Sequence, residues 1–239
     1  MSTTGPAAKG GGVPVGLVAA VIVVVVALGA VMVYLLGRGE EELAGTGPQG
    51  SLPEGGGMVI AEGSGEDVPR LHLYADFQCP WCAALEEQAG DDLAAAAAGG
   101  EVALTVSLRT FLDDTLSNDA STRAAELAMC VADEGQFLEF YQRVLAHQPA
   151  TEGEGWTDAE LLGHAQAAGV EGEALERTRG CYEQGRYADY VTDMDERAVR
   201  EGVTGTPTLA VDGEPLSQEE MTMLLSEEDG LRTVLEAGA

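Results

Sequence analysis

Two cysteines, Cys79 and Cys82, lie where a strand-like pattern gives way to a helix-like one. Over residues 71–77, apolar and more polar side chains alternate with the period of two that is typical of a strand. Pro80 suits the first position of a helix, because a residue there needs no N–H donor. Cys79 would then cap the helix, with its sulfur facing unpaired N–H groups and the positive end of the helix dipole. Both effects favour a thiolate, so the sequence predicts a reactive cysteine.

Three kinds of chemistry fit this cysteine pair. In a redox pair, the Cys79 thiolate attacks a disulfide and Cys82 resolves the mixed disulfide that forms. In a zinc knuckle, the pair would supply half of four ligands, but Cys130 and Cys181 are solitary, and the three histidines have no ligand-like spacing to a cysteine. A purely structural disulfide is the third interpretation. We predict the redox pair, with no bound cofactor or metal, because two-residue loops recur at catalytic sites.

An uncharged apolar stretch covers residues 13–36. As a helix, its 24 residues would extend for about 36 Å, enough to cross a hydrocarbon core of about 30 Å. The stretch is long for a cleavable signal and no small-residue cleavage site follows it, so we predict an uncleaved signal anchor rather than a cleaved signal. Lys9, within residues 1–12, precedes the stretch and Arg38 follows it. This balance predicts a single-pass cell-membrane protein with a cytoplasmic N-terminus and an extracytoplasmic C-terminal domain.

Residues 37–66 are rich in glycine and glutamate and lack periodicity, so we predict a flexible linker with a root-mean-square span of about 30 Å. The globular domain is expected over residues 67–239. The net charge of the chain is −29. Nucleic acid is therefore excluded as a partner, because a phosphate backbone binds clustered lysines and arginines. The acidic composition instead indicates a well-solvated surface.

The expected domain begins with a strand, a helix and a second strand. An alanine-rich helix is predicted over residues 83–98, with a break near Gly90, and alternation over residues 102–108 predicts the second strand. A strand–helix–strand order is typical of a parallel pair and of an α/β fold. Spacings of three and four between apolar residues then predict a largely helical region over about residues 117–200.

The last part of the chain predicts a hairpin and a helix. Residues 206–211 form a short strand pattern that ends at Asp212-Gly213, a sequence typical of a tight hairpin turn. Two possible capping boxes begin at Thr157 and Ser217, each of which has a glutamate three residues later. We therefore expect helices to start at both positions.

This order of elements resembles the DsbA-like branch of the thioredoxin superfamily, in its membrane-anchored bacterial, actinobacterial type. The resemblance is carried by Asp-Phe-Gln-Cys-Pro-Trp-Cys at residues 76–82 and by Gly-Val-Thr-Gly-Thr-Pro at residues 202–207. It covers about residues 67–239. It implies a thioredoxin fold with a helical insertion, preceded by a single transmembrane helix and a linker, and the activity of a thiol-disulfide oxidoreductase.

The resemblance also implies a role for each matching residue. Cys79 would be the attacking cysteine and Cys82 the resolving one. Pro207 would follow a cis peptide bond beside the active disulfide, and Thr206 would contact both sulfurs and the backbone of a client. Trp81 has two interpretations from the sequence, contact with a client or packing across the turn.

One position departs from the family pattern. Many relatives carry an acidic residue six positions before the first cysteine, where it is thought to exchange a proton with the buried cysteine. This chain has Leu73 there, and Asp76 falls on the other side of the strand alternation. The proton of Cys82 is therefore expected to move through another group or through water.

Cys130 and Cys181 lie apart from the redox pair, in the predicted helical region. The even number of cysteines and the exported location favour a structural disulfide between them over two buried thiols or a second redox pair. Such a bridge would close a loop of about 50 residues, with a stabilisation of about 4 kcal/mol in the chain-entropy model. The resemblance adds that some actinobacterial relatives have a second bridge.

The predicted function is disulfide formation in exported cysteine-containing proteins. The resemblance implies that a membrane reoxidase of the DsbB or VKOR type would restore the disulfide. The helix N-terminus favours an oxidase by stabilising the Cys79 thiolate, whereas Asp76, Glu86 and Glu87 oppose that effect. A reductase or isomerase, and a non-catalytic thioredoxin-like binding module, are the alternative hypotheses.

Overall fold

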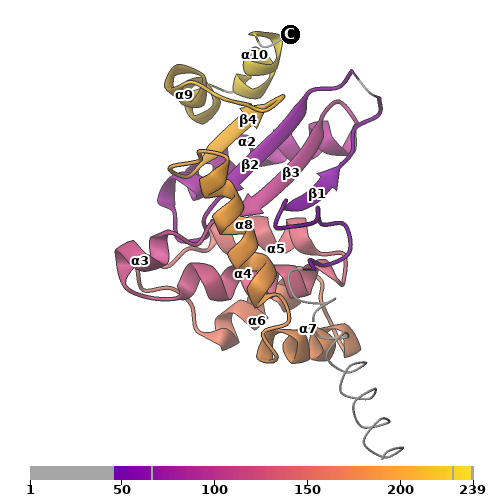
Figure 1. Cartoon of the computed structure of the whole chain (residues 1–239), viewed down its shortest axis with the longest axis vertical. Helices are drawn as coiled ribbons and strands as arrows, with labels where there is room; N and C mark the ends of the chain where they lie inside the picture. The colour runs from indigo at the N-terminus through magenta and orange to yellow at the C-terminus, as the bar shows by residue number, and fades with distance from the viewer. Residues whose placement is uncertain (1–45, 66, 228, 238–239) are drawn as a thin grey trace, which may run out of the picture. The chain divides into compact units, whose positions relative to one another are not determined.

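The computed structural model describes residues 46–65, 67–227 and 229–237 (Figure 1). The predicted N-terminal segment, residues 1–12, and the predicted transmembrane anchor, residues 13–36, lie outside the described residues. Within the described ranges, no helix combines the length and the apolar character that a membrane span requires.

A five-stranded mixed sheet forms the centre of the domain, with the strand order β1-β3-β2-β4-β5. The central strands β2 and β3 run parallel, as the strand–helix–strand pattern predicts, and the other pairs are antiparallel. The predicted hairpin is also present, because Asp212 and Gly213 adopt the positive φ values of a tight turn between β4 and β5. The strands are β1 Met58–Ala61, β2 Arg70–Ala75, β3 Ala103–Leu108, β4 Thr208–Val211 and β5 Glu214–Pro215.

The strand β1 corrects the predicted boundary of the linker at residues 37–66. It pairs with the outer edge of β3, and its Met58 side chain is buried. Upstream of it, the Tyr190 hydroxyl donates to the carbonyl oxygens of Leu52 (2.7 Å) and Gly57 (3.2 Å). Backbone pairing on a free sheet edge needs no strong side-chain alternation, which explains why the sequence pattern missed this strand. The folded domain therefore includes residues that were predicted to be linker.

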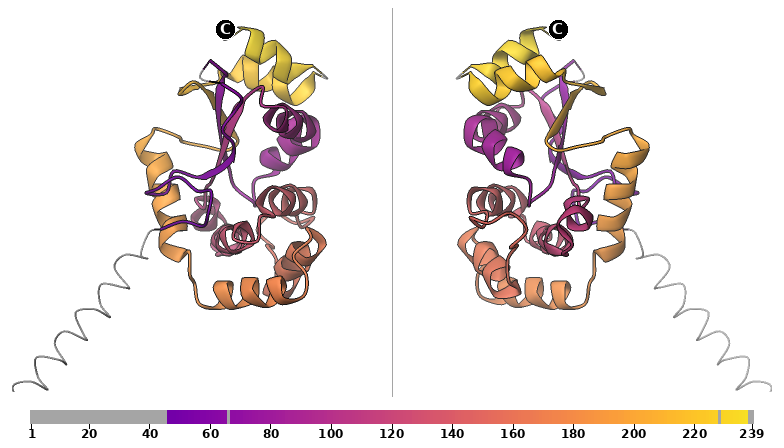
Figure 2. Two further views of the ribbon diagram at one scale, coloured as in Figure 1. Left: turned by 90° about the vertical axis from the view of Figure 1, so that its right-hand side faces the viewer. Right: turned by 90° about the vertical axis from the view of Figure 1, so that its left-hand side faces the viewer.

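Helices cover both faces of the sheet. Figure 2 shows α2 and the two yellow C-terminal helices on one side and the orange α8 on the other. Below the sheet in Figure 1, the helices α3 to α7 form a separate layer where the sequence predicts the helical insertion. The helices are α2 Pro80–Ala98, α3 Leu112–Leu116, α4 Ala120–Ala132, α5 Phe137–Ala146, α6 Asp158–Ala167, α7 Glu173–Glu183, α8 Ala188–Arg200, α9 Gln218–Ser226 and α10 Gly230–Ala237.

The helix α2 runs without interruption, so the predicted break near Gly90 is wrong. Its alanine-rich sequence has a high helix propensity, which outweighs one glycine. Gly90 also has a packing reason, because a Cβ atom there would overlap the carboxylate of Glu86. That carboxylate accepts a hydrogen bond from Gln142 Nε2 of α5 at 2.8 Å. The glycine thus makes room for a carboxylate that lies flat along the helix.

The insertion has its own core and a covalent cross-link. Both predicted capping boxes are present, at Thr157 before α6 and at Ser217 before α9. Cys130 of α4 and Cys181 of α7 form a disulfide, with their α-carbons 5.9 Å apart. The bridge fastens α7 to α4, which is the most deeply buried helix of the insertion. The interior around α4 is lined by apolar side chains that include Ala124, Leu127, Met129, Val131, Phe140, Leu161 and Met194.

Candidate active site

The two cysteines of the Cys-Pro-Trp-Cys turn are free thiols at the start of α2. Cys79 is the N-cap residue with extended backbone angles (φ −77°, ψ 117°), and Pro80 occupies the first turn, as the sequence predicts. Cys79 as a residue is only 5% exposed. A hydrogen bond from the Cys82 thiol, helped by the Thr206 side chain and by backbone N–H groups of the first turn, lowers the pKa of Cys79 from 9.0 to about 6 against the opposing effect of burial.

Cys82 lies deeper, in the first turn of α2, and is 1% exposed. Burial, followed by the hydrogen bond to Cys79 and the charge on that sulfur, raises the pKa of Cys82 well above its usual value of 9.0. The backbone N–H of Asp76 opposes this shift through a hydrogen bond to the Cys82 sulfur. The two thiols therefore differ in protonation, with a thiolate at Cys79 and a neutral, more deeply buried thiol at Cys82.

A loop from far along the chain closes over the thiols. The Thr206–Pro207 peptide bond is cis, and the Cys79 sulfur lies 3.3 Å from the Thr206 carbonyl oxygen. The Thr206 hydroxyl is buried and makes no conventional hydrogen bond with the other described residues, but it interacts with both sulfurs. The structure thus brings together four residues that the sequence had placed in one site.

Two polar contacts, one buried and one partly buried, hold this loop in place. Arg109, immediately after β3, donates from Nη1 to the carbonyl oxygen of Val203 at 2.9 Å and forms an ion pair with Asp195 of α8 at 2.6 Å. The Tyr74 hydroxyl donates to the Glu201 carboxylate at 2.7 Å. The signal in the sequence that could have identified Arg109 is a charged residue directly after an apolar strand.

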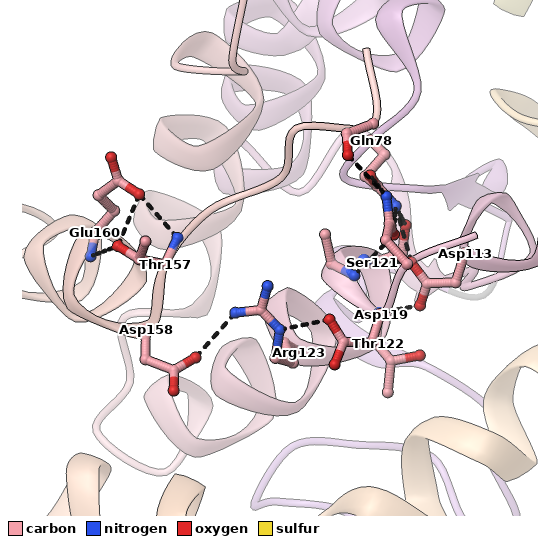
Figure 3. A network of polar contacts seen from close by, with 12 residues as sticks. Gln78, Asp113, Asp119, Ser121, Thr122, Arg123, Thr157, Asp158 and Glu160 are labelled. Carbon is pink, nitrogen blue, oxygen red and sulfur yellow. Dashed lines mark hydrogen bonds and ion pairs between the residues drawn. The ribbon is translucent and has the colours of Figure 1, made fainter. Parts of the chain in front are cut away.

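The amide of Gln78 connects the active-site turn to the helical insertion. Figure 3 shows its side chain directed at Asp113 and Ser121. Gln78 Nε2 lies 2.8 Å from Asp113 Oδ1, 2.9 Å from Asn118 Oδ1 and 2.9 Å from Ser121 Oγ. Asn118 donates back to Gln78 Oε1 at 2.9 Å. Because each buried amide atom has a partner, the network can fix the position of the turn against the insertion.

Asp76 occupies the floor of the turn, next to this network, and is fully buried. Its carboxylate accepts hydrogen bonds from the Ser121 hydroxyl at 2.5 Å and from the backbone N–H groups of Gln78 at 2.9 Å and Leu112 at 3.3 Å. Burial raises the pKa of Asp76 from 3.8 to about 7, although these hydrogen bonds act in the opposite direction.

The sequence model of the family described as Thioredoxin matches residues 57–227. The chain belongs to the thioredoxin family. Among solved structures, it is similar to MdbA, a thiol-disulfide oxidoreductase from Actinomyces oris, with a TM-score of 0.67 and 19% identity over 81% of this chain and 94% of that one. It is also similar to reduced DsbA from Mycobacterium tuberculosis, with a TM-score of 0.56 and 24% identity over 76% and 99% of the two chains. The fold is therefore the DsbA-like form of the thioredoxin fold.

Curated relatives with a similar sequence include the serine/threonine-protein kinase PknE of Mycobacterium tuberculosis. The match is 28% identical over 152 residues and covers 61% of this chain. The chain spans about a quarter (27%) of the length of these relatives.

Gln148 also belongs to this thioredoxin-family site, although it was not predicted from the sequence. It lies in the loop between α5 and α6. Its Nε2 donates to the carbonyl oxygens of Phe77 at 2.7 Å and Cys79 at 2.9 Å. A single glutamine in a long loop carries no local pattern, so only the three-dimensional structure could identify it.

Trp81 and Leu73 mark the surface and the interior of the site. The Trp81 side chain is 65% exposed beside the reactive thiol, so it does not pack across the turn. Leu73 is 3% exposed in β2 and lies between Val106 of β3 and Leu209 of β4. An acidic side chain at that position would be surrounded by apolar groups, and here the position contributes to the core instead.

Proposed function

We propose that this protein is an extracytoplasmic thiol-disulfide oxidoreductase that introduces disulfides into exported proteins. The observation that supports the proposal most strongly is the split between the two thiols, with the pKa of Cys79 lowered to about 6 and that of Cys82 raised. A thiol with a pKa of about 6 is roughly 90% thiolate at pH 7. Stabilising this thiolate stabilises the reduced protein, and that makes the disulfide form a stronger oxidant.

The chemistry follows from the arrangement of the two sulfurs. A client thiolate attacks Cys79 in the Cys79–Cys82 disulfide, which forms a client–Cys79 bond, breaks the bond between the two cysteines and releases Cys82, which takes up a proton. A second client thiolate then attacks the client sulfur of this mixed disulfide, and Cys79 leaves as a thiolate. The client loses two electrons, and the cysteine pair gains them.

The surface beside Cys79 is suited to a polypeptide client. The exposed Trp81 offers an apolar contact on one side of the sulfur. The cis Thr206–Pro207 loop offers backbone groups on the other side. We assign client binding to Trp81, Thr206 and Pro207, and we assign a structural role to the Cys130–Cys181 disulfide.

The proposed location is the outer face of the cell membrane, with the stretch at residues 13–36 as a single-pass anchor. The Cys130–Cys181 disulfide supports an oxidising compartment, because structural disulfides are rare in the cytosol. Each catalytic cycle leaves the cysteine pair reduced, so the proposal requires an oxidising partner. A membrane reoxidase of the DsbB or VKOR type would meet that requirement.

The test compares oxidation and reduction by the same preparation. The full chain in mild detergent should oxidise a reduced two-cysteine peptide stoichiometrically, faster than it reduces insulin in the presence of dithiothreitol. Cys79→Ser should abolish both reactions, whereas a Cys130→Ala/Cys181→Ala variant that remains folded should retain them. Faster insulin reduction would instead favour the reductase or isomerase. Peptide binding with no turnover in the wild-type chain would favour the binding module.

A further inference from the structure

The proposed cycle requires Cys82 to gain and lose a proton inside the protein. Cys82 is 1% exposed, so bulk water does not reach its sulfur directly. The position that is acidic in many relatives is Leu73, which has no proton to exchange. Another group must therefore serve the buried thiol.

Glu86 is the first candidate, because it lies one turn after Cys82 on the same helix. Side chains four residues apart on a helix are neighbours. The Glu86 carboxylate, however, lies against Gly90, in the next turn away from Cys82. Its hydrogen bond from Gln142 holds it there. Glu86 is therefore directed away from the thiol.

Asp76 is placed better, since its own backbone N–H forms a hydrogen bond to the Cys82 sulfur. Covalent geometry keeps the carboxylate of an aspartate within about 5 Å of its own backbone nitrogen. The carboxylate and the sulfur thus lie close to the same nitrogen atom. Water or a rotation of the side chain can close the remaining gap, as is common for proton transfers in resting enzymes.

The surroundings of Asp76 suit a group that changes its protonation state. The elements around the carboxylate contribute the Ser121 hydroxyl of α4, the Asp113 carboxylate of α3 and the backbone N–H groups of Gln78 and Leu112. The charge of Asp113 opposes ionisation of Asp76. Burial holds the pKa of Asp76 near 7, so the group can accept and release a proton at neutral pH.

Hydrogen-bonded polar side chains connect Asp76 to a cavity beside the active-site turn. The Ser121 hydroxyl donates to Asp76 and lies 2.9 Å from Gln78 Nε2. Gln78 also lines a cavity of about 180 Å³ beside Pro80, with Gln148 and the loop of residues 149–156 completing its wall. Figure 3 shows the Gln78 side chain reaching towards Ser121. The carboxylate thus lies two hydrogen bonds away from a residue that lines this cavity.

We propose that Asp76 exchanges the proton of Cys82 in the thiol–disulfide reaction of this protein, which rests on the function proposed above. When the reduced pair is reoxidised, Cys79 first forms a mixed disulfide with the oxidising partner. The Cys82 proton then passes to the Asp76 carboxylate. The Cys82 sulfur bonds to the Cys79 sulfur, the bond between Cys79 and the partner breaks, and the partner leaves as a thiolate. In the opposite direction, protonated Asp76 returns the proton to the departing Cys82 thiolate.

The experiment uses dithiobis(nitrobenzoate) as the oxidising disulfide, because each of its two steps releases one coloured thionitrobenzoate. Attack by Cys79 releases the first, and attack by Cys82 on the mixed disulfide releases the second. Stopped-flow absorbance of the reduced full chain in detergent, from about pH 5 to about pH 9, gives a pH profile for each step. The wild-type second step should show an inflection near pH 7, where Asp76 ionises.

Asp76→Asn should slow the second step at least about tenfold and remove its inflection, while the first step stays within about twofold. Ser121→Ala is the milder variant. It removes a hydrogen bond that lowers the pKa of Asp76, so the inflection of the second step should move to higher pH. Ser107→Ala is the matched control, because Ser107 is also buried but its hydroxyl forms its hydrogen bond with His72 and not with Asp76.

An unchanged rate and inflection in Asp76→Asn would overturn the inference. If Asp76→Asn does not fold, Ser121→Ala decides, and an inflection that stays at the wild-type pH would overturn it equally. Failure of the proposed function has a different signature. In that case the wild-type chain would fail to oxidise the two-cysteine peptide even though both thionitrobenzoate steps were observed.

Discussion

The pKa of Cys79 should depend strongly on its neighbour Cys82, whose hydrogen bond is the largest contribution that lowers it. Cys82→Ala removes this donor and leaves the helix N-terminus and the Thr206 side chain in place. The first turn of α2 should keep its geometry, because alanine favours a helix. The substitution therefore isolates one hydrogen bond to a thiolate.

The size of the effect follows from the energy of such a bond. A hydrogen bond to a charged group contributes about 1.5–3 kcal/mol, which corresponds to about 1–2 pKa units. The pKa of Cys79 should rise from about 6 to about 7–8. At pH 7 the thiolate fraction would fall from about 90% to about 10–50%, so alkylation should slow by about two- to ninefold.

The assay is the rate of Cys79 alkylation by iodoacetamide as a function of pH, followed by intact mass. The alkylation rates of the wild type and the variant should converge near pH 9, where Cys79 is largely ionised in both proteins. Cys82→Ser, which keeps a hydroxyl donor, should shift the midpoint less than Cys82→Ala. A midpoint for Cys82→Ala that coincides with the wild-type value would refute the reasoning, because the backbone N–H groups and Thr206 would then account for the whole shift.

Three further predictions concern stability. The pKa of Asp76 is higher in the folded protein than in the unfolded chain, so protonated Asp76 contributes to stability fully below about pH 4, and this contribution is lost as the pH rises through 7. In urea titrations over this pH window, the free energy of unfolding of the wild type should fall by up to about 4 kcal/mol relative to that of Asp76→Asn. Replacing both Cys130 and Cys181 with alanine should lower the free energy of unfolding by about 2–5 kcal/mol. A urea midpoint equal to that of the wild type would contradict this prediction. Gly90→Ala should stabilise the folded protein by about 0.5–1 kcal/mol in a Glu86→Ala background. With Glu86 present, the same substitution should stabilise the protein less, or destabilise it, because the Glu86 carboxylate occupies the space of the new Cβ atom.

The sequence predicted those parts of the site that depend on local patterns. Cys79, Cys82 and Pro80 are adjacent, and their chemistry follows from a strand-to-helix turn. Thr206 and Pro207 came only from the family resemblance, because no local pattern places a loop some 125 residues away against the thiols. The structure does so through the antiparallel pairing of β4 with β2.

The remaining residues of the site depend on tertiary contacts that leave no signature in the sequence. Gln148 reaches the carbonyl oxygen of Cys79 from the helical insertion. Arg109, immediately after β3, donates a hydrogen bond to the carbonyl oxygen of Val203. The sequence placed Asp76 in the motif at residues 76–82, on the other side of the strand alternation from Leu73, and indicated only that its charge would oppose the Cys79 thiolate. The significance of Asp76 lies in its complete burial, which is a property of the folded state.

The reduction potential of the Cys79–Cys82 couple tests the central claim most directly, because it reports which redox form the protein stabilises. Thiolate formation with a pKa of about 6 stabilises the reduced form at pH 7 by about 1.4 kcal/mol, or about 30 mV, relative to an ordinary thiol. Equilibration of the full chain with glutathione buffers should therefore give a potential at least about 30 mV less reducing than the value of about −270 mV for thioredoxin, shifted towards the value of about −120 mV found for DsbA. A potential at or below about −270 mV would contradict a disulfide-forming role.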